Sequence, residues 1–248
     1  MENKCSEKRI SIICACNNED IYSNMLLPSL QKQSFKNYEI IKLGTKNFGF
    51  KSAADALNYG ASISSGEILV FVHQDLEFTG DDALYLLSFY CDKYDFGIAG
   101  VAGTVAGGKI FSSVLNGPDK EQAGINVDNV TKVDTLDECL LIVKRSEFVD
   151  FVNYGSWHFY GVEYSLRMKR DNKSVLVFPI PVYHLSPGWS LDKTYWRTLR
   201  MVAQEHRECK VIPTTMGQYA NNGFLRFSIL IRRIKRRLKK FAKSNVGH

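Results

Sequence analysis

The sequence of 248 residues lacks any long apolar run. No stretch approaches the roughly 18 consecutive apolar residues of a membrane-spanning helix. Residues 1–9 are polar and contain no apolar segment of the kind found in secretion signals. These absences predict a protein without a spanning helix and without a signal peptide.

The cysteine spacings of metal and redox sites are missing as well. The six cysteines are scattered along the chain: Cys5, Cys14, Cys16, Cys91, Cys139 and Cys209. Neither a zinc-type spacing nor a Cys-x-x-Cys pair occurs among them. We therefore expect reduced and mostly buried thiols, and a cytoplasmic location.

Acidic residues are absent after Glu208, while nine lysines and arginines lie between Arg226 and Lys243. Removing these nine charges from the net charge of +6 leaves the rest of the chain at −3. The excess of positive charge therefore belongs to a C-terminal tail, residues 223–248, and the body, residues 1–222, is mildly acidic.

In the tail, apolar residues recur in steps of four and three: Phe227, Ile231, Ile234, Leu238 and Phe241. This spacing places them on one face of a helix, with lysines and arginines opposite. Such a helix is typical of one that lies on an anionic membrane surface. Nucleic-acid binding, a solvated helix and a coiled-coil seam that would make a homo-oligomer are the alternatives. We expect the membrane surface and no nucleic acid, because the apolar stripe is continuous.

The body alternates predicted strands and helices in steps of roughly 30 residues. Strands are expected at 9–16, 38–43, 68–72 and 97–101, and helices at 21–30, 51–64 and 81–94. This order predicts an α/β fold with a doubly wound, mostly parallel sheet.

After residue 101 the pattern loosens into a glycine-punctuated stretch that reaches residue 132. Helices are expected again at 157–170 and 191–208. Residues 174–183 contain Pro179 and Pro181, and we expect them to form an edge strand.

The run 68–72 is apolar throughout and is followed at once by His73, Gln74 and Asp75. A strand of this kind is typical of burial on both faces in a parallel sheet. The polar triplet then lies at its carboxyl end, where open α/β sheets bind ligands. A carboxylate there is well placed to hold a divalent metal against a phosphate. The alternative is that Asp75 caps a helix that begins near Gly80.

Five segments in this order resemble family 2 glycosyltransferases of the GT-A fold: residues 10–19, 56–67, 73–75, 157–167 and 181–184. The chain looks closest to the subgroup with His-Gln-Asp in place of Asp-x-Asp. The resemblance covers about residues 9–205. It implies a GT-A domain that transfers a sugar from a nucleotide diphosphate donor, a UDP-sugar being favoured. The implied acceptor is a glycan or a lipid-linked molecule in surface polysaccharide or glycoconjugate synthesis, at the inner face of the cell membrane.

The resemblance also implies where the donor binds. The first strand and its turn would receive the base and ribose, and the start of the helix at 51–64 would face phosphate. The residues expected at the donor are Ala15, Asn17, Asn18, Glu19, Lys51, Ser52 and Gln74. A helix cap is the alternative for Asn17, and a solvated helix start is the alternative for Lys51.

The metal implied by the resemblance is Mn²⁺ or Mg²⁺, with Asp75 as its ligand. His184 is the candidate second ligand, and an imidazole ligand favours Mn²⁺. A purely structural role is the alternative for His184. We expect His73 to orient the strand end and not to bind the metal.

Inverting transfer requires a general base that takes the proton of the acceptor hydroxyl. The family usually places an acidic pair where this chain has Tyr160 and Gly161. Glu163 and Asp137 are the candidate bases, with Glu138 beside the latter. An ion pair with Arg167, four residues on, is the alternative for Glu163. Because the pair is missing, a nucleotide-sugar-binding partner of another transferase, itself impaired in catalysis, is the alternative function.

Overall fold

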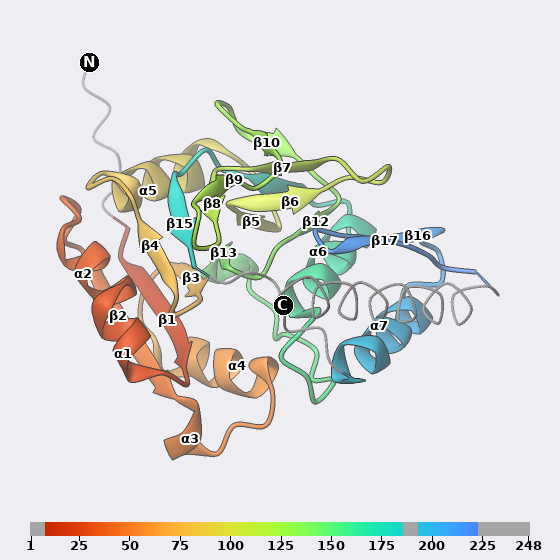
Figure 1. The fold of residues 1–248 in the computed structure, drawn as a ribbon, viewed down its shortest axis with the longest axis horizontal. Helices are drawn as coiled ribbons and strands as arrows, with labels where there is room; N and C mark the ends of the chain where they lie inside the picture. Colours follow the sequence, from red (N-terminus) through yellow and green to blue (C-terminus); the bar gives the residue numbers. More distant parts are fainter. Residues whose placement is uncertain (1–7, 186–192, 223–248) are drawn as a thin grey trace, which may run out of the picture.

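The computed structural model describes residues 8–185 and 193–222, which form a mixed α/β fold (Figure 1). The basic helix predicted for residues 223–248 and the boundary placed before it lie at or beyond the end of the described residues. No helix in the described part of the chain combines the length and the hydropathy needed to cross a membrane.

The main sheet has seven strands. In sheet order they are β11 (Thr131–Lys132), β14 (Val175–Val177), β5 (Ile98–Gly100), β13 (Leu140–Lys144), β3 (Ile68–Val72), β1 (Ile10–Cys16) and β2 (Tyr38–Gly44). Strand β1 pairs in parallel with β2 and β3, and β14 pairs in parallel with β5. All five residues of β3 are buried, as their unbroken apolar character predicts.

Helices cover both faces of this sheet. The helices of the described chain are α1 (Glu19–Asn24), α2 (Leu26–Gln31), α3 (Thr45–Phe48), α4 (Ala53–Ile63), α5 (Ala83–Lys93), α6 (Tyr160–Arg170) and α7 (Lys193–Glu205), with a 3₁₀ turn η1 (Arg145–Glu147). Of these, α7 packs against α6 in a separate cluster. Helices α1, α2 and α5 share one core cluster with Ile12 and Val70, and α4 and α6 share another with Ile13 and Phe71. The two clusters take alternate residues of β1 and β3, because successive side chains of a strand point to opposite faces.

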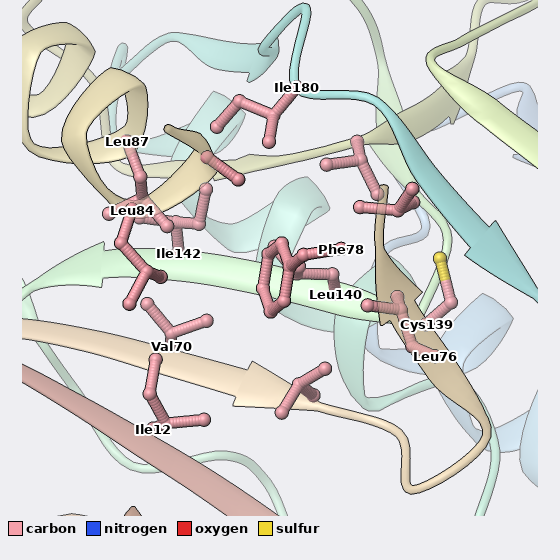
Figure 2. Close-up of a cluster of buried hydrophobic side chains, with 14 of the residues drawn as sticks. Ile12, Val70, Leu76, Phe78, Leu84, Leu87, Cys139, Leu140, Ile142 and Ile180 are labelled. Carbon is pink, nitrogen blue, oxygen red and sulfur yellow. The ribbon is translucent and has the colours of Figure 1, made fainter. Parts of the chain in front are cut away.

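The first of these clusters is shown in Figure 2, where Leu84 and Leu87 of α5 lie close to Ile142 of β13 and Val70 of β3. These side chains are fully buried. The cluster holds α5 against the sheet, so the strand ends around it are rigid supports for side chains that follow them.

Three smaller sheets complete the described fold. One contains β10 (Ile125–Asn126), β7 (Ile110–Ser112), β6 (Ala102–Thr104) and β12 (Thr135–Leu136). Another contains β4 (Leu76–Phe78), β15 (Val182–His184), β8 (Val114–Asn116) and β9 (Glu121–Gln122), and a hairpin joins β16 (Val211–Thr214) to β17 (Gly217–Ala220). The stretch without periodicity is therefore built of short strands, too short to show alternation in sequence.

Two features differ from the sequence-based expectation. Strand β13 runs antiparallel to both β3 and β5 in the middle of the sheet. The single edge strand predicted for 174–183 is wrong: β14 lies inside the main sheet and β15 lies in another sheet. Pro179 and Pro181 fall between these two strands, where no ladder hydrogen bond is lost.

Glu39 of β2 ties the start of the sheet together and predicts a pH-dependent stability. Its carboxylate accepts hydrogen bonds from the Ser11 hydroxyl at 2.7 Å and from the Ser65 backbone N–H at 2.7 Å. Burial opposes ionisation, but these bonds outweigh it and lower the pKa of Glu39 to about 2. We expect Glu39→Gln to reduce the free energy of unfolding at pH 7 by about 1.5–3 kcal/mol.

Because the pKa of Glu39 is depressed in the folded state, its stabilisation is full above the unfolded value and is lost as pH falls toward 2. The difference between Glu39→Gln and the wild type should therefore shrink between about pH 5 and pH 2. Urea unfolding across this range measures it, with Glu121→Gln at an exposed position as the control. A pH-independent difference would contradict the assignment.

Candidate active site

A cavity of about 670 Å³ opens at the carboxyl ends of β1, β2 and β3. Its wall includes Ala15 near the end of β1 and Asn17 after it, Thr45 and Lys46 after β2, and His73 to Asp75 after β3. Asp137 and Glu138 also reach it, because the antiparallel β13 begins at the edge where its parallel neighbours end. The volume lies within the roughly 300–1,000 Å³ of small-molecule sites.

Gln74 joins the end of β3 to the turn after β1. Its side-chain oxygen accepts the backbone N–H groups of Asn17 and Asn18, each at 2.9 Å, and its side-chain nitrogen donates to Asn17 Oδ1 at 2.7 Å. Asn18 in turn caps α1 through the Ile21 N–H at 3.2 Å. The two polar strand ends are thus locked into one cavity wall.

His184 faces Asp75 with a defined ring nitrogen. Its Nδ1 lies 3.2 Å from the amide oxygen Asn116 Oδ1, which can only accept, so Nδ1 carries a proton. Its Nε2 lies 3.4 Å from Asp75 Oδ1. Burial disfavours the charged ring, but the hydrogen bond to Asp75 and the negative charges of Asp75 and Asp137 together outweigh it and raise the pKa of His184. Burial also disfavours the charged form of Asp75, but the bond to His184, the charge of His184 and weaker nearby interactions together outweigh it and lower the pKa of that carboxyl.

His73 is oriented by Tyr160 at the start of α6. Burial raises the pKa of the Tyr160 hydroxyl, which keeps its proton and donates it to the Glu138 backbone oxygen at 3.1 Å. That hydroxyl can then only accept from His73 Nε2, which lies 3.1 Å away. His73 Nδ1 is left facing His184 Nε2 at 3.4 Å. Burial and the neighbouring His184 lower the pKa of His73 to about 4, so its ring is neutral.

His73, Asp75 and His184 together fit a divalent metal. Their ligand atoms lie within 4.8 Å of one another. His73 Nδ1 and His184 Nε2 lie 3.9 Å and 3.4 Å from Asp75 Oδ1, and each ring holds its other nitrogen in a hydrogen bond. A divalent ion bound there would replace the proton that His184 Nε2 donates to Asp75. His73, expected only to orient the strand end, thus lies in the cluster as a third ligand candidate. Its position directly after the buried strand β3 was the sequence signal that could have predicted this role.

The three carboxylates considered as bases have different surroundings. Asp137 lines the cavity, but its oxygens accept the Cys139 N–H at 3.1 Å and the Thr215 hydroxyl at 2.6 Å. Glu138 also lines the cavity. Glu163 lies outside the cavity lining, 1% exposed, with its carboxylate 3.1 Å from Arg167. Glu163 therefore forms the ion pair with Arg167 that was the alternative to a catalytic role. A proton from an acceptor in the cavity could not reach its carboxylate directly.

The residues predicted at the donor divide in a similar way. Ala15, Asn17 and Gln74 line the cavity, whereas Asn18, Glu19, Lys51 and Ser52 do not. Glu19 pairs with Lys42 at 2.6 Å, and Ser52 caps α4 through the Asp55 N–H at 3.1 Å.

Several cavity residues were missed from the sequence. Lys46, in the short helix α3 after β2, is the lysine that lines the cavity. The rule that ligands gather at the carboxyl ends of parallel strands would have found it. Thr214 at the end of β16, and Thr215 and Met216 in the turn that follows, also line the cavity, and the sequence has no signal for this turn.

A family model described as "Glycosyltransferase like family" matches residues 11–212. The chain belongs to this glycosyltransferase-like family. The family and the fold confirm the GT-A architecture predicted from the sequence. Comparison with curated proteins found no match.

Solved structures of glycosyltransferase-like fold resemble the chain at low sequence identity. The mannosyltransferase PcManGT from Pyrobaculum calidifontis, in complex with GDP-Man and Mn²⁺, is 12% identical with a TM-score of 0.57, over 83% of this chain and 66% of that one. S. aureus TarS 1-349 in complex with UDP-GlcNAc is 14% identical with a TM-score of 0.53, over 79% of this chain and 66% of that one. The chain thus spans just under two thirds of the length of these proteins, and the likeness concerns the fold.

Proposed function

We propose that this member of the glycosyltransferase-like family is a metal-dependent inverting enzyme that moves a sugar from a nucleotide diphosphate donor, a UDP-sugar being favoured, to a glycan or lipid-linked acceptor. The observation that carries the proposal is the convergence of His73, Asp75 and His184 in a cavity bounded by the β1 turn. A bound divalent ion there would supply Lewis-acid stabilisation of the charge on the departing diphosphate.

Other residues of the cavity wall would bind the donor and exclude water from it. Asn17 and Gln74 present a locked pair of amide groups to the base and ribose of the donor. Lys46 offers a cation to the diphosphate on the same side of the cavity. The aromatic residues Trp157 and Tyr160 line the cavity beside the start of α6, where they exclude water from the sugar.

Mn²⁺ is favoured over Mg²⁺ because two of the three ligand candidates are imidazoles, and Mg²⁺ prefers oxygen ligands. The Mn²⁺ in the mannosyltransferase of similar fold agrees with this preference without deciding it. The subgroup defined by His-Gln-Asp, and the roles of surface polysaccharide synthesis and of the anionic membrane, remain part of the proposal.

Tyr160→Phe is expected to weaken Mn²⁺ binding by about 10- to 100-fold. The variant removes the hydroxyl that holds the proton on His73 Nε2, so Nδ1 is no longer fixed as a ligand atom. Calorimetric titration with MnCl₂ measures the effect. Tyr164→Phe is the matched control, since its hydroxyl accepts the Val149 N–H at 3.1 Å outside the cavity lining. Equal affinities in both variants would exclude His73 as a ligand.

The proposed activity is tested by nucleoside diphosphate release. UDP-glucose, UDP-galactose, UDP-N-acetylglucosamine and GDP-mannose are each incubated with Mn²⁺, Mg²⁺ or EDTA, with water or octyl β-glucoside as acceptor. We expect release from at least one donor with Mn²⁺ and none with EDTA. Tight donor binding without release under any metal would support the catalytically impaired partner instead, the alternative that the glycine at position 161 suggests.

A further inference from the structure

Glu138 lies in the cavity wall beside the start of α6. It lies two residues before β13 begins and directly faces the first turn of α6. Its carboxylate accepts the Gly161 N–H at 3.3 Å, and its backbone oxygen accepts the Tyr160 hydroxyl at 3.1 Å. Through Tyr160 and His73, the residue is held at a fixed position relative to the metal-ligand cluster.

The other carboxylates of the cavity are engaged. The cavity wall holds Asp75, Asp137 and Glu138. Asp75 belongs to the histidine cluster, and Asp137 holds the β16–β17 turn through Thr215. In the described part of the chain, Glu138 forms no ion pair, and the groups that bond its carboxylate are backbone N–H groups at the start of α6. It is therefore the carboxylate available to an incoming hydroxyl.

The proton affinity of Glu138 suits this task. Burial, and then the adjacent Asp137, raise the pKa of Glu138 to about 8, and the backbone N–H groups of α6 oppose the rise. The titratable groups that face it are Asp137 beside it, Tyr160 on α6 and Tyr195 on α7. A base with a pKa near the working pH combines a populated ionised form with a strong pull on the proton.

The absence of a side chain at Gly161 leaves room for the side chain of Glu138. A Cβ at position 161 would lie 3.0 Å from Glu138 Cγ and 3.2 Å from Leu141 Cδ1. The side chain of Glu138 therefore fills the volume that a side chain on the first turn of α6 would need. A carboxylate can reach this space either from the first turn of α6 or from the residues before β13. In this chain it comes from Glu138, before β13.

We propose that Glu138 is the general base of the transfer, an inference that rests on the proposed function. Its carboxylate oxygen takes the proton of the acceptor hydroxyl while the hydroxyl oxygen bonds to the anomeric carbon. The bond from that carbon to the diphosphate oxygen breaks, and its electron pair leaves with the nucleoside diphosphate. Each bond formed is balanced by one broken, and no further reactant is required.

The test compares Glu138→Gln with the wild type, using the donor that supports release with Mn²⁺ and octyl β-glucoside or water as acceptor. We expect kcat to fall by about 10²- to 10⁴-fold, while the Kd for the nucleoside diphosphate stays within a factor of about three. The wild-type rate should rise with pH up to about 8, and the variant should lose this dependence. Glu121→Gln, at an exposed position, is the control.

A double variant distinguishes a base from a structural support. Glu138→Gly empties the space, and adding Gly161→Asp returns a carboxylate from the helix side. We expect the double variant to be at least about tenfold faster than Glu138→Gly alone, because proximity of the base governs the rate. A purely structural role for Glu138 predicts no such recovery and would overturn the proposal.

The remaining outcomes are also separable. Wild-type rates and pH dependence in Glu138→Gln would overturn the assignment of the base and leave the transferase function intact. Loss of the pH dependence in Asp137→Asn instead would overturn the assignment to Glu138, because Asp137 is the other candidate base that lines the cavity. Absence of nucleotide release from the wild type with every donor and metal would overturn the proposed function together with this inference.

Discussion

Asp75→Asn is expected to lower metal-dependent nucleotide release by about 10²- to 10³-fold, because Lewis-acid stabilisation of the leaving diphosphate contributes several kcal/mol and each 1.4 kcal/mol is worth tenfold in rate. Asp75 is the sole carboxylate of the His73–Asp75–His184 cluster and lies 3.4 Å from His184 Nε2. Asparagine keeps the size of the side chain and removes its charge. The loss should therefore be one of metal affinity and turnover, with the fold retained.

The measurement combines MnCl₂ titration with steady-state release of nucleoside diphosphate. Asp95→Asn is a suitable control, because Asp95 is exposed between α5 and β5 and lies outside the cavity lining. Unchanged Mn²⁺ affinity in Asp75→Asn would mean that the cluster is not the metal site. Unchanged turnover with lost affinity would mean that the metal has no part in the chemistry.

Phe71→Ala is expected to reduce the free energy of unfolding by about 3–5 kcal/mol. Phe71 of β3 is 1% exposed, and its ring packs against Phe148 at 5.6 Å and edge-on against Phe151 at 4.9 Å between centroids. The substitution leaves a hole beneath the cavity floor, since the surrounding aromatic rings can collapse only in part. A loss of this size is a large share of the 5–15 kcal/mol that typically separates folded from unfolded protein.

Urea unfolding measures this loss as a shift of the midpoint at constant m-value. Phe89→Ala is the control of the same chemistry, because Phe89 of α5 is 38% exposed and loses little contact. It should cost less than about 1 kcal/mol. Similar losses in both variants would show that burial at the sheet centre is not the source of the effect.

The main elements could be predicted because their signals are local. β1 is largely apolar and β3 is a continuous apolar run, and Ser52 and Asn18 occur where helices begin and cap them. The direction of β13 could not be predicted, since its short apolar run, Leu140 to Val143, has the same pattern in either direction. Its partners β3 and β5 lie about 40–70 residues earlier in the chain, and only their pairing fixes the direction.

The candidate site shows the same division. Asp75, His184 and Gln74 were predicted as site residues because each ends or follows a strand, and all three line the cavity. Lysine 51 was expected at the donor, whereas Lys46 lines the cavity. The two lysines differ little in sequence context, and only the fold places Lys46, which follows the carboxyl end of β2, in the cavity wall.

By itself, the sequence determined the α/β order and the polar triplet His73-Gln74-Asp75 at the end of a buried strand, because these depend on periodicity and on order along the chain. The GT-A architecture followed from the resemblance of five segments to family 2 glycosyltransferases. The tertiary structure alone decided which ring nitrogens lie nearest Asp75 and which carboxylate of the cavity faces the first turn of α6. Those properties depend on neighbours far apart in sequence: Asn116 beside His184, and Gly161 beside Glu138. Protonation and hydrogen bonding respond to the atoms that surround a group, and only folding brings those atoms together.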